Sequence, residues 1–502
     1  MKRGWIISLF AAVAFSLSCV ACNTAVCKTH TDKNDDGICD TCKESVTVTF
    51  DFFAVNDLHG KFADTDTQPG VDELSTYLKT ARAVNENTIL LSSGDMWQGS
   101  SESNLTKGQL MTDWMNETDF VSMTLGNHEY DWGESYIESN LAAAEFPFLA
   151  INVYECGTNA RVEYCQPSVT VEKGGVTIGI IGAIGDCYSS ISSDKVQDVY
   201  FKTGSELTAL VKAESEKLRA EGADYIVYSL HDGYGKSYGS TMSIADGNLD
   251  YYDISLSDGY VDLVFEGHTH QRYVLKDSNG VYHLQGGGDN DGVSHAEVTI
   301  NYVNDTAFVN EAEFISTDAY DSLADDPVVE SLLTKYEKDI ALADKVLGRN
   351  AKYRTGNELR QLIADLYFKA GLEKWGDRYD IVLGGGFMSV RSPYNLAVGE
   401  VLYGDLQSLF PFDNELVLCS VSGYYLKTKF FETTNTNYFI AYGDYGASVK
   451  ETVDSNATYY IITDSYSSSY APNHLTEIER YDSTTFARDL LAAYVQAGGL
   501  AT

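Results

Sequence analysis

Five short clusters of Asp, Asn and His stand out in this chain because their side chains could together bind metal ions. Carboxylate oxygens and imidazole nitrogens are the usual ligands at hydrolytic metal sites, and one carboxylate can bridge two ions about 3.5 to 4 Å apart. Two Asp, one Asn and four His are enough for two neighbouring ions with room for a bridging hydroxide. The clusters are Asp57-Leu58-His59-Gly60, Gly94-Asp95, Gly126-Asn127-His128-Glu129-Tyr130-Asp131, His231-Asp232 and Gly267-His268-Thr269-His270.

Each cluster directly follows an apolar run that predicts a buried strand. Ligands at the C-terminal ends of such strands converge on one rim of a sheet. Taken singly, each cluster is typical of a cap or a turn, but nothing in core packing requires all five in this order. The sequence therefore predicts a two-metal site, for which Zn, Mn, Fe and Co are all suitable. The runs are residues 46–55, 88–92, 120–125, 223–230 and 261–265.

The rest of the pattern predicts two α/β domains. Residues 46–318 alternate strand-like runs with helical stretches at 71–84 and 205–220, which indicates a layered α/β domain. Residues 319–347 contain an amphipathic stretch from Asp326 to Leu347 that predicts a connecting helix. Residues 348–502 form a second α/β domain, with helices expected around 358–369 and 483–496.

Composition excludes some classes of protein. A chain of 502 residues is too long for one ordinary hydrophobic core, so more than one domain is expected. The 44% hydrophobic content excludes a mostly disordered chain. A net charge of -38, from 73 acidic and 35 basic residues, argues against a nucleic-acid duplex as partner. The same charge repels a phosphorylated substrate at long range, so local metal charge must overcome it.

Residues 1–22 predict an export signal. Lys2 and Arg3 precede an apolar stretch that is too short to span a membrane and ends in small residues. Small residues before Cys22, or before Cys19, are also what a bacterial lipoprotein signal needs, and plain secretion is the alternative. We therefore expect an exported protein, either a cell-surface lipoprotein acylated at Cys22 or a secreted or periplasmic one. Any membrane attachment is expected at this end only.

Residues 23–45 are rich in Cys and Asp and allow three interpretations. Cys27 and His30 with Cys39 and Cys42 form a complete set of zinc ligands. Alternatively, the spacing of the oxygen-bearing side chains matches the first half of a calcium loop, with Gly37 allowing the turn. The third interpretation is an unstructured stalk. The calcium set consists of Asp32, Asn34 and Asp36.

The motifs resemble the signature of the calcineurin-like metallophosphoesterases. The variant Val55-Asn56-Asp57-Leu58-His59-Gly60 with Asn127-His128-Glu129-Tyr130-Asp131 is similar to the 5′-nucleotidase branch, whose bacterial members include exported two-domain enzymes. The resemblance covers nearly everything from residue 46 onward. It implies a four-layer α/β/β/α catalytic domain followed by an α/β substrate-binding domain of the 5′-nucleotidase type.

The resemblance also implies roles for single residues. Asp57, His59 and His270 would hold the first metal, Asn127, His231 and His268 the second, and Asp95 would bridge them. His128 would face the leaving group without binding metal, oriented by Asp131. A metal-bridged hydroxide would then attack phosphorus in line.

In the second domain the resemblance is weaker. A Gly-rich turn at Gly385 and Gly386 would let the backbone approach the phosphate, or would simply be a tight strand-to-helix turn. Arg391, with Arg354 as a second contact, would bind phosphate, and Phe412 would stack on the base. Leu383 stands where the family has Asn, and the family's second aromatic segment is absent. Tyr466 or Tyr470 could replace its ring, and we take Tyr470 as the candidate.

Together these features predict an exported metal-dependent phosphoric ester hydrolase that removes phosphate from extracellular nucleotides. The alternatives within the same chemistry are a 2′,3′-cyclic-nucleotide phosphodiesterase and a UDP-sugar hydrolase. From another class comes a surface binding protein that retains the fold without turnover. The intact set of ligands together with His128 and Asp131 favours an enzyme.

Overall fold

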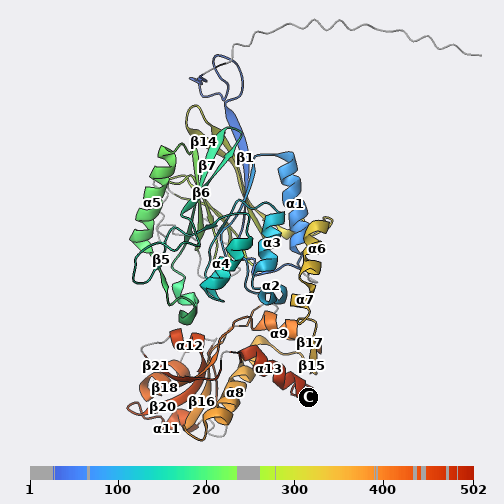
Figure 1. The fold of residues 1–502 in the computed structure, drawn as a ribbon, viewed down its shortest axis with the longest axis vertical. Coiled ribbons are helices and arrows are strands. Elements are labelled where there is room, and N and C mark those ends of the chain that lie inside the picture. The colour runs from blue at the N-terminus through green and yellow to red at the C-terminus, as the bar shows by residue number, and fades with distance from the viewer. Residues whose placement is uncertain are drawn as a thin grey trace, which may run out of the picture.

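The computed structural model shows an elongated molecule with two domains and a small module at one end (Figure 1). The N-terminal module, residues 27 and 29–45, sits at the start of β1, Thr47–Val55, and the second domain lies at the far end of the molecule. The described residues are 27, 29–64, 68–234, 260–277, 279–388, 390–391, 394–432, 438–442, 448–470, 474–482 and 484–501.

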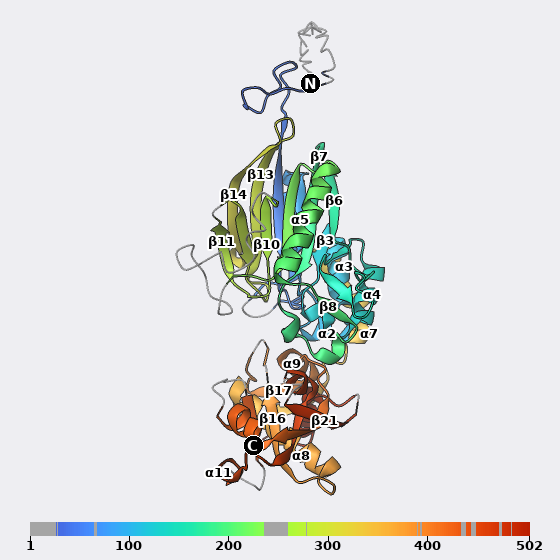
Figure 2. The same ribbon diagram turned by 90° about the vertical axis from the view of Figure 1, so that its left-hand side faces the viewer.

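The first domain contains two six-stranded sheets packed face to face (Figure 2). In the first sheet, β1 pairs in parallel with β2 and antiparallel with β13. Its strands, in spatial order, are β14 Thr306–Ser316, β13 Gly292–Asn301, β1, β2 Thr88–Ser92, β3 Ser122–Thr124 and β4 Phe148–Leu149. The order in the second is β11 Arg272–Lys276, β12 Tyr282–Gly286, β10 Leu263–Glu266, β9 Tyr225–His231, β7 Val176–Ile184 and β6 Ser168–Lys173. A short pair, β5 Val153–Glu155 and β8 Val199–Phe201, completes the domain.

Alternating apolar side chains of the two sheets form the core between them. Phe52 and Leu91 of the first sheet belong to one buried cluster with Ile180, Val227 and Phe265 of the second. Because each sheet is covered on both faces, by the other sheet and by helices, its strands read as near-continuous apolar runs. All five predicted strands are present.

Helices cover the two outer faces and complete the four layers. Helix α5, Gly204–Ala220, packs on the second sheet through Leu207, Val211 and Leu218. Helix α1, Val71–Val84, and α3, Gln109–Glu117, pack on the first sheet. The expected α/β/β/α arrangement is confirmed. The other helices of this domain are α2 Ser101–Leu105 and α4 Glu134–Ala143, with 3-10 turns at 128–130, 188–190, 193–195 and 317–319.

The predicted connecting helix is shorter than expected. Helix α6, Pro327–Lys335, begins at Asp326, whose side chain accepts from the amides of residues 328 and 329. The separate short helix α7, Glu337–Ile340, follows it. The prediction of helix up to Leu347 is wrong because Val346–Asn350 is strand β15, which pairs with β17, Gly399–Leu402.

The second domain has a five-stranded sheet with helices on both sides. Its order is β19 Tyr438–Ala441, β16 Ile381–Phe387, β20 Thr458–Asp464, β18 Leu416–Ser422 and β21 Leu475–Arg480. Helix α8, Gly356–Trp375, packs on β16 and opens with a capping box in which Thr355 and Glu358 bond each other's backbone amides. The remaining helices are α9 Tyr403–Leu409, α10 Gly423–Tyr425, a π-helical turn at 426–431, α11 Ser448–Thr452, α12 Ser465–Tyr470 and α13 Ala487–Gln496.

No helix among the described residues is long and apolar enough to cross a membrane. The predicted export signal and Cys22 lie outside the described residues.

Candidate active site

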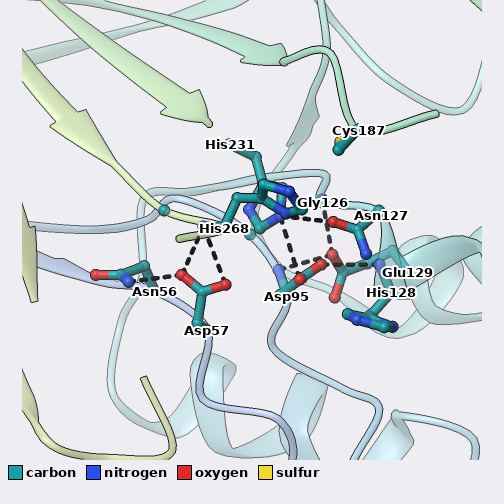
Figure 3. Close-up of polar contacts among 12 residues, drawn as sticks. Asn56, Asp57, Asp95, Gly126, Asn127, His128, Glu129, Cys187, His231 and His268 are labelled. Carbon is teal, nitrogen blue, oxygen red and sulfur yellow. Dashed lines mark hydrogen bonds and ion pairs between the residues drawn. The ribbon is translucent and has the colours of Figure 1, made fainter. Parts of the chain in front are cut away.

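The five Asp, Asn and His clusters meet at one rim of the two sheets. Each follows the C-terminal end of a strand, namely β1, β2, β3, β9 and β10. Figure 3 shows Asp57, Asp95, Asn127, His231 and His268 pointing toward one another. The convergence that the strand pattern predicts is therefore present.

The candidate ligands lie close together in overlapping groups. Ligand atoms of Asp57, His59 and His270 all lie within 4.8 Å of one another, as do those of Asp95, His231 and His268. The same holds for His59, Asp95 and His128. In the first group, Nε2 of His59 is 3.0 Å from Nε2 of His270. In the second, Nε2 of His231 is 3.2 Å from Asp95 Oδ2 and 3.2 Å from the Asn127 side-chain oxygen.

Backbone carbonyls fix which nitrogen of two histidines faces the site. Nδ1 of His59 lies 2.8 Å from the carbonyl oxygen of Gln98, and Nδ1 of His231 lies 2.7 Å from that of Ser93. Because a carbonyl only accepts, each Nδ1 carries the proton and donates, which leaves Nε2 directed at its neighbours. Such orientation is what a metal ligand requires.

The backbone at the rim is held in an unfavourable conformation. Asp57, His59, Asp95, His268 and His270 all have φ between 50° and 66°, in the left-handed region that side chains with a Cβ seldom adopt. Strain of this kind persists at functional sites, where the surrounding structure enforces it. Five of the seven candidate ligands share it, which agrees with a functional role for the rim.

The charges at the rim fit bound cations. Burial, followed by nearby His231, lowers the pKa of His268 to about 4, and burial and Arg391 hold the pKa of His59 well below its usual range. Neutral imidazoles of this kind can donate a lone pair to a metal. Although burial lowers it, Asp95 and then Asp57 raise the pKa of His231 to about 10, since buried carboxylates favour positive charge beside them. A divalent cation would supply that charge.

His128 lies beside the ligand clusters and connects the two domains. Its Nδ1 is 2.6 Å from Asp131 Oδ2, and its Nε2 accepts from the Arg391 guanidinium at 2.7 Å. Burial lowers the pKa of His128, but Asp131 and Asp95 outweigh it, so the net pKa is raised. The guanidinium cannot accept, so Nε2 is unprotonated while this contact lasts.

A cavity of about 420 Å³ opens over His128 between the domains. The Arg391 guanidinium lies 5.5 Å from the centre of the Phe412 ring, which in turn is 5.8 Å from the His128 ring. Phe387 and Tyr466 form a tilted ring pair 5.7 Å apart. The lining includes Asn127, His128, Asp131, His268 and His270 from the first domain and Phe387, Arg391, Tyr394, Phe412, Asn414 and Tyr466 from the second.

Comparisons with known proteins agree with this geometry. The family model described as calcineurin-like phosphoesterase matches residues 50–272, which contain all the candidate ligands. Residues 50–272 form a calcineurin-like phosphoesterase domain. The protein is a metal-dependent phosphoric ester hydrolase, and its C-terminal domain matches that of 5′-nucleotidase structures.

Relatives share both domains. UshA of Yersinia enterocolitica is 26% identical over 415 residues, 73% of this chain and 73% of its own length. A 5′-nucleotidase of Diplobatis ommata is 24% identical over 419 residues, 75% of this chain and 69% of its own. The structure of a 5′-nucleotidase precursor from Thermus thermophilus superimposes with a TM-score of 0.65 at 18% identity, covering 90% of this chain and 96% of that one.

Sequence reasoning on the phosphoesterase missed Glu129, which holds two ligand loops together. Its fully buried carboxylate accepts from the amides of Asp95 at 2.9 Å, Met96 at 2.9 Å and Gly126 at 2.7 Å (Figure 3). Burial and then the charge of Asp95 raise the pKa of Glu129 to about 7. The only sequence feature that points to a role for Glu129 is its position between His128 and Tyr130 in the motif.

Replacing Glu129 by Gln is expected to destabilise the phosphoesterase and weaken metal binding. The side-chain NH2 of Gln would face at least one of three amide donors, and a buried donor without a partner costs roughly 1–3 kcal/mol. Loss of an outer-shell contact typically lowers metal affinity about 10- to 100-fold. Thermal unfolding and metal titration check both effects, with exposed Glu117→Gln as the matched control. Unchanged unfolding and affinity in Glu129→Gln would contradict the role of this carboxylate.

The glycine prediction in the second domain is wrong. Gly385 and Gly386 lie inside strand β16 and not in a turn, and neither lines the cavity. A Cβ on Gly385 would lie 2.1 Å from the Phe439 carbonyl oxygen, and one on Gly386 would lie 2.5 Å from Thr463 Oγ1. The glycines are therefore needed for close packing of β16, which positions Phe387 at its end.

Two further predicted substrate contacts also change. Arg354 does not line the cavity, and its Nε donates to Asn350 Oδ1 at 3.0 Å, within the second domain. Of the two candidate tyrosines, Tyr466 lines the cavity, whereas the side chain of Tyr470 lies outside the described residues. Tyr466 is thus the candidate that the structure places beside Phe387.

Arg488, which had no sequence signal, holds the loop that carries Phe412. Its side chain is only 4% exposed, and Nη1 donates to the Phe412 carbonyl at 3.0 Å and to the Pro411 carbonyl at 3.3 Å. It also pairs with Asp413, which bonds Lys107 of the first domain at 2.8 Å. Ser190 and Ser192, likewise not predicted, contribute to the cavity from the first domain.

Proposed function

We propose that the protein is a two-metal 5′-nucleotidase that releases phosphate from extracellular nucleotides. The observation that carries the proposal is one cavity lined both by His128 with the ligand rim and by Arg391 with aromatic rings. A phosphate ester bound there would have its phosphate at the rim and its organic part against the second domain.

We assign two divalent ions to the rim. Asp57, His59 and His270 would hold one, Asn127, His231 and His268 the other, and Asp95 both. The close grouping of Asp57 with His59 and His270, and of Asp95 with His231 and His268, supports this assignment. The Asn127 oxygen, 3.2 Å from Nε2 of His231, supports its place in the second set. Bound together, two such ions supply an activated water and neutralise phosphate charge. The oxygen and imidazole ligands suit Zn, Mn, Fe or Co.

Arg391 and His128 would act on the phosphate and on the leaving oxygen. The Nε of Arg391 is buried and has no hydrogen-bond partner among the described residues, which supports an anion as its missing partner. A phosphate that accepts from Arg391 would release Nε2 of His128, which now accepts from the same guanidinium. Asp131 then holds the imidazole at Nδ1, and Nε2, once it has taken a proton from solvent, donates that proton to the departing ester oxygen.

The rings suit a nucleobase. Phe412, Phe387 and Tyr466 line one cavity, and flat apolar surfaces of this kind stack on bases irrespective of their hydrogen-bond pattern.

A panel of substrates tests the proposal directly. The purified, metal-loaded enzyme is incubated with AMP, ADP, 2′,3′-cyclic AMP, UDP-glucose and glycerol phosphate, and released phosphate and product are measured. The proposal predicts the highest kcat/KM for AMP. A preference for the cyclic nucleotide or for UDP-glucose would replace it with one of those activities, and no turnover of any ester would favour a binding protein.

The role of stacking can be separated from that of phosphate binding. Phe412→Ala is expected to raise KM for AMP about tenfold or more, because base–aromatic stacking contributes roughly 1–3 kcal/mol. KM for glycerol phosphate should change little, since that ester has no ring. Tyr424→Ala, at an exposed aromatic in the same domain, is the matched control. Equal effects on both substrates would contradict stacking on Phe412.

Export and lipid attachment at Cys22 stay predictions from the sequence. If these predictions hold, the enzyme would act outside the cytoplasm, and the cell could take up the nucleosides that it releases.

A further inference from the structure

A second group of metal-type ligands lies outside the cavity, in the N-terminal module. Ligand atoms of Cys27, His30, Cys39 and Cys42 all lie within 4.8 Å of one another. The module, blue in Figure 1, lies at the end of the first domain opposite to the second domain. This group is therefore independent of the catalytic rim.

Its distances match the edges of a zinc tetrahedron. Zn–S and Zn–N bonds of about 2.3 and 2.0–2.1 Å give S···S edges of about 3.8 Å and S···N edges of about 3.5 Å. The sulfurs of Cys27 and Cys39 are 3.8 Å apart, and the Cys42 sulfur is 3.4 Å from Nδ1 of His30. All three cysteines are free thiols. One zinc ion fits between them with little rearrangement.

The electrostatics of the sulfurs agree with this geometry. The thiolate is the form of cysteine that binds metal. Three sulfurs in one place also repel one another as anions, and a dication removes that repulsion.

The calcium interpretation fits less well, because the oxygen ligands are already used. Asp32 Oδ1 accepts from the amide of Asp36 at 3.1 Å. Its Oδ2 accepts from the amide of Gly37 at 2.8 Å and from the side chain of Asn301 at 2.9 Å. Asp36 in turn accepts from Asn34 at 2.7 Å. These bonds shape the loop between the two pairs of zinc ligands.

We propose that Cys27, His30, Cys39 and Cys42 bind one structural zinc ion. The ion closes the module into a rigid unit docked on the turn between β13 and β14. Asn304 of that turn donates to the Asp32 carbonyl at 2.7 Å, and the Tyr302 ring meets the His30 ring edge to face, with centroids 6.4 Å apart. Zinc would thus fix the module on the first domain.

The test uses the full chain loaded with Zn²⁺ or Co²⁺. The variant Cys39→Ser/Cys42→Ser is compared with wild type and with Cys156→Ser, which removes an exposed free cysteine elsewhere. We expect the double variant to bind one equivalent of zinc fewer than both, measured by elemental analysis. In the Co²⁺ form, the sulfur-to-cobalt charge-transfer band should be present in wild type and Cys156→Ser and absent from the double variant. The proposed catalytic ligands include no thiolate, so the band reports on the module.

A third variant protects the test against misfolding. Cys42→His keeps four ligands and is expected to retain the zinc equivalent with a weaker charge-transfer band. Equal zinc content in wild type and the double variant would overturn the proposal. So would one bound calcium ion in place of zinc, or a Cys27–Cys39 disulfide in the non-reduced peptide map. These readouts are metal content and thiol state, so they do not depend on phosphatase activity.

Discussion

Asp95→Asn is expected to lower kcat/KM for AMP by about 10³-fold or more and to reduce the content of bound metal. Asp95 is the carboxylate assigned to both ions. A metal that stabilises the charge on the phosphoryl group lowers the activation barrier by several kcal/mol, and about 1.4 kcal/mol corresponds to a tenfold change in rate. Asn keeps the shape and can still accept from the His128 amide, which now bonds Asp95 Oδ1 at 2.8 Å. The loss would therefore report on charge and not on the fold of the loop.

The measurements for Asp95→Asn are steady-state kinetics and elemental analysis of the purified enzyme. Asp51→Asn is the matched control, because Asp51 lies on β1, pairs with His295 and does not line the cavity. We expect the control to keep wild-type kcat/KM. Treatment of the wild-type enzyme with a chelator should reproduce the loss of activity. Added metal should then restore the activity of the wild-type enzyme but not that of Asp95→Asn. Full activity of chelated enzyme would overturn the assignment of the rim.

His128→Ala is expected to lower kcat for AMP by about 10²- to 10⁴-fold while metal content stays unchanged. The imidazole is held by Asp131 and faces the cavity, but it is not among the seven assigned ligands. The nucleoside leaves as a poor leaving group that needs a proton. A nitrophenyl phosphate, whose leaving group is stable as an anion, should therefore lose far less activity in the same variant.

This contrast between leaving groups is the decisive measurement for His128. Asp131→Asn should show the same pattern with a smaller loss, because the imidazole remains but loses its anionic partner. An equal loss on both esters would indicate a role in positioning the phosphate. Loss of bound metal in His128→Ala would show that this histidine is itself a ligand.

The first domain could be predicted from the sequence because its strands and the ligands that follow them are recognisable from short stretches of the chain. Apolar runs of strand length precede each ligand cluster, so the order along the chain already places Asp57, Asp95 and His231 at strand ends. What remained hidden there depends on contacts between loops. Glu129 reaches the amides of two separate loops, and nothing in its spacing reveals that reach.

The second domain was predicted less well because its roles depend on packing. The sequence of Gly385 and Gly386 is typical of a turn, but both residues lie in strand β16. They are glycines there because Phe439 and Thr463 approach too closely for a side chain. The Arg354 side chain donates to Asn350 within the second domain, whereas that of Arg391 donates to His128 of the first domain. No local sequence pattern distinguishes the two arginines. The connecting helix ended early because strand pairing with β17 took its last residues.

The contact between Arg391 and His128 has a consequence for how such an enzyme can change. The residues assigned to chemistry and those assigned to ligand choice come from separate stretches of the chain and meet at this contact. Exchanges at Phe387, Phe412 or Tyr466 can therefore reshape the preferred ester while the hydrolytic centre stays intact. Changes in the second half of the chain can therefore give this scaffold new specificities while the metal-binding residues of the first half remain constant.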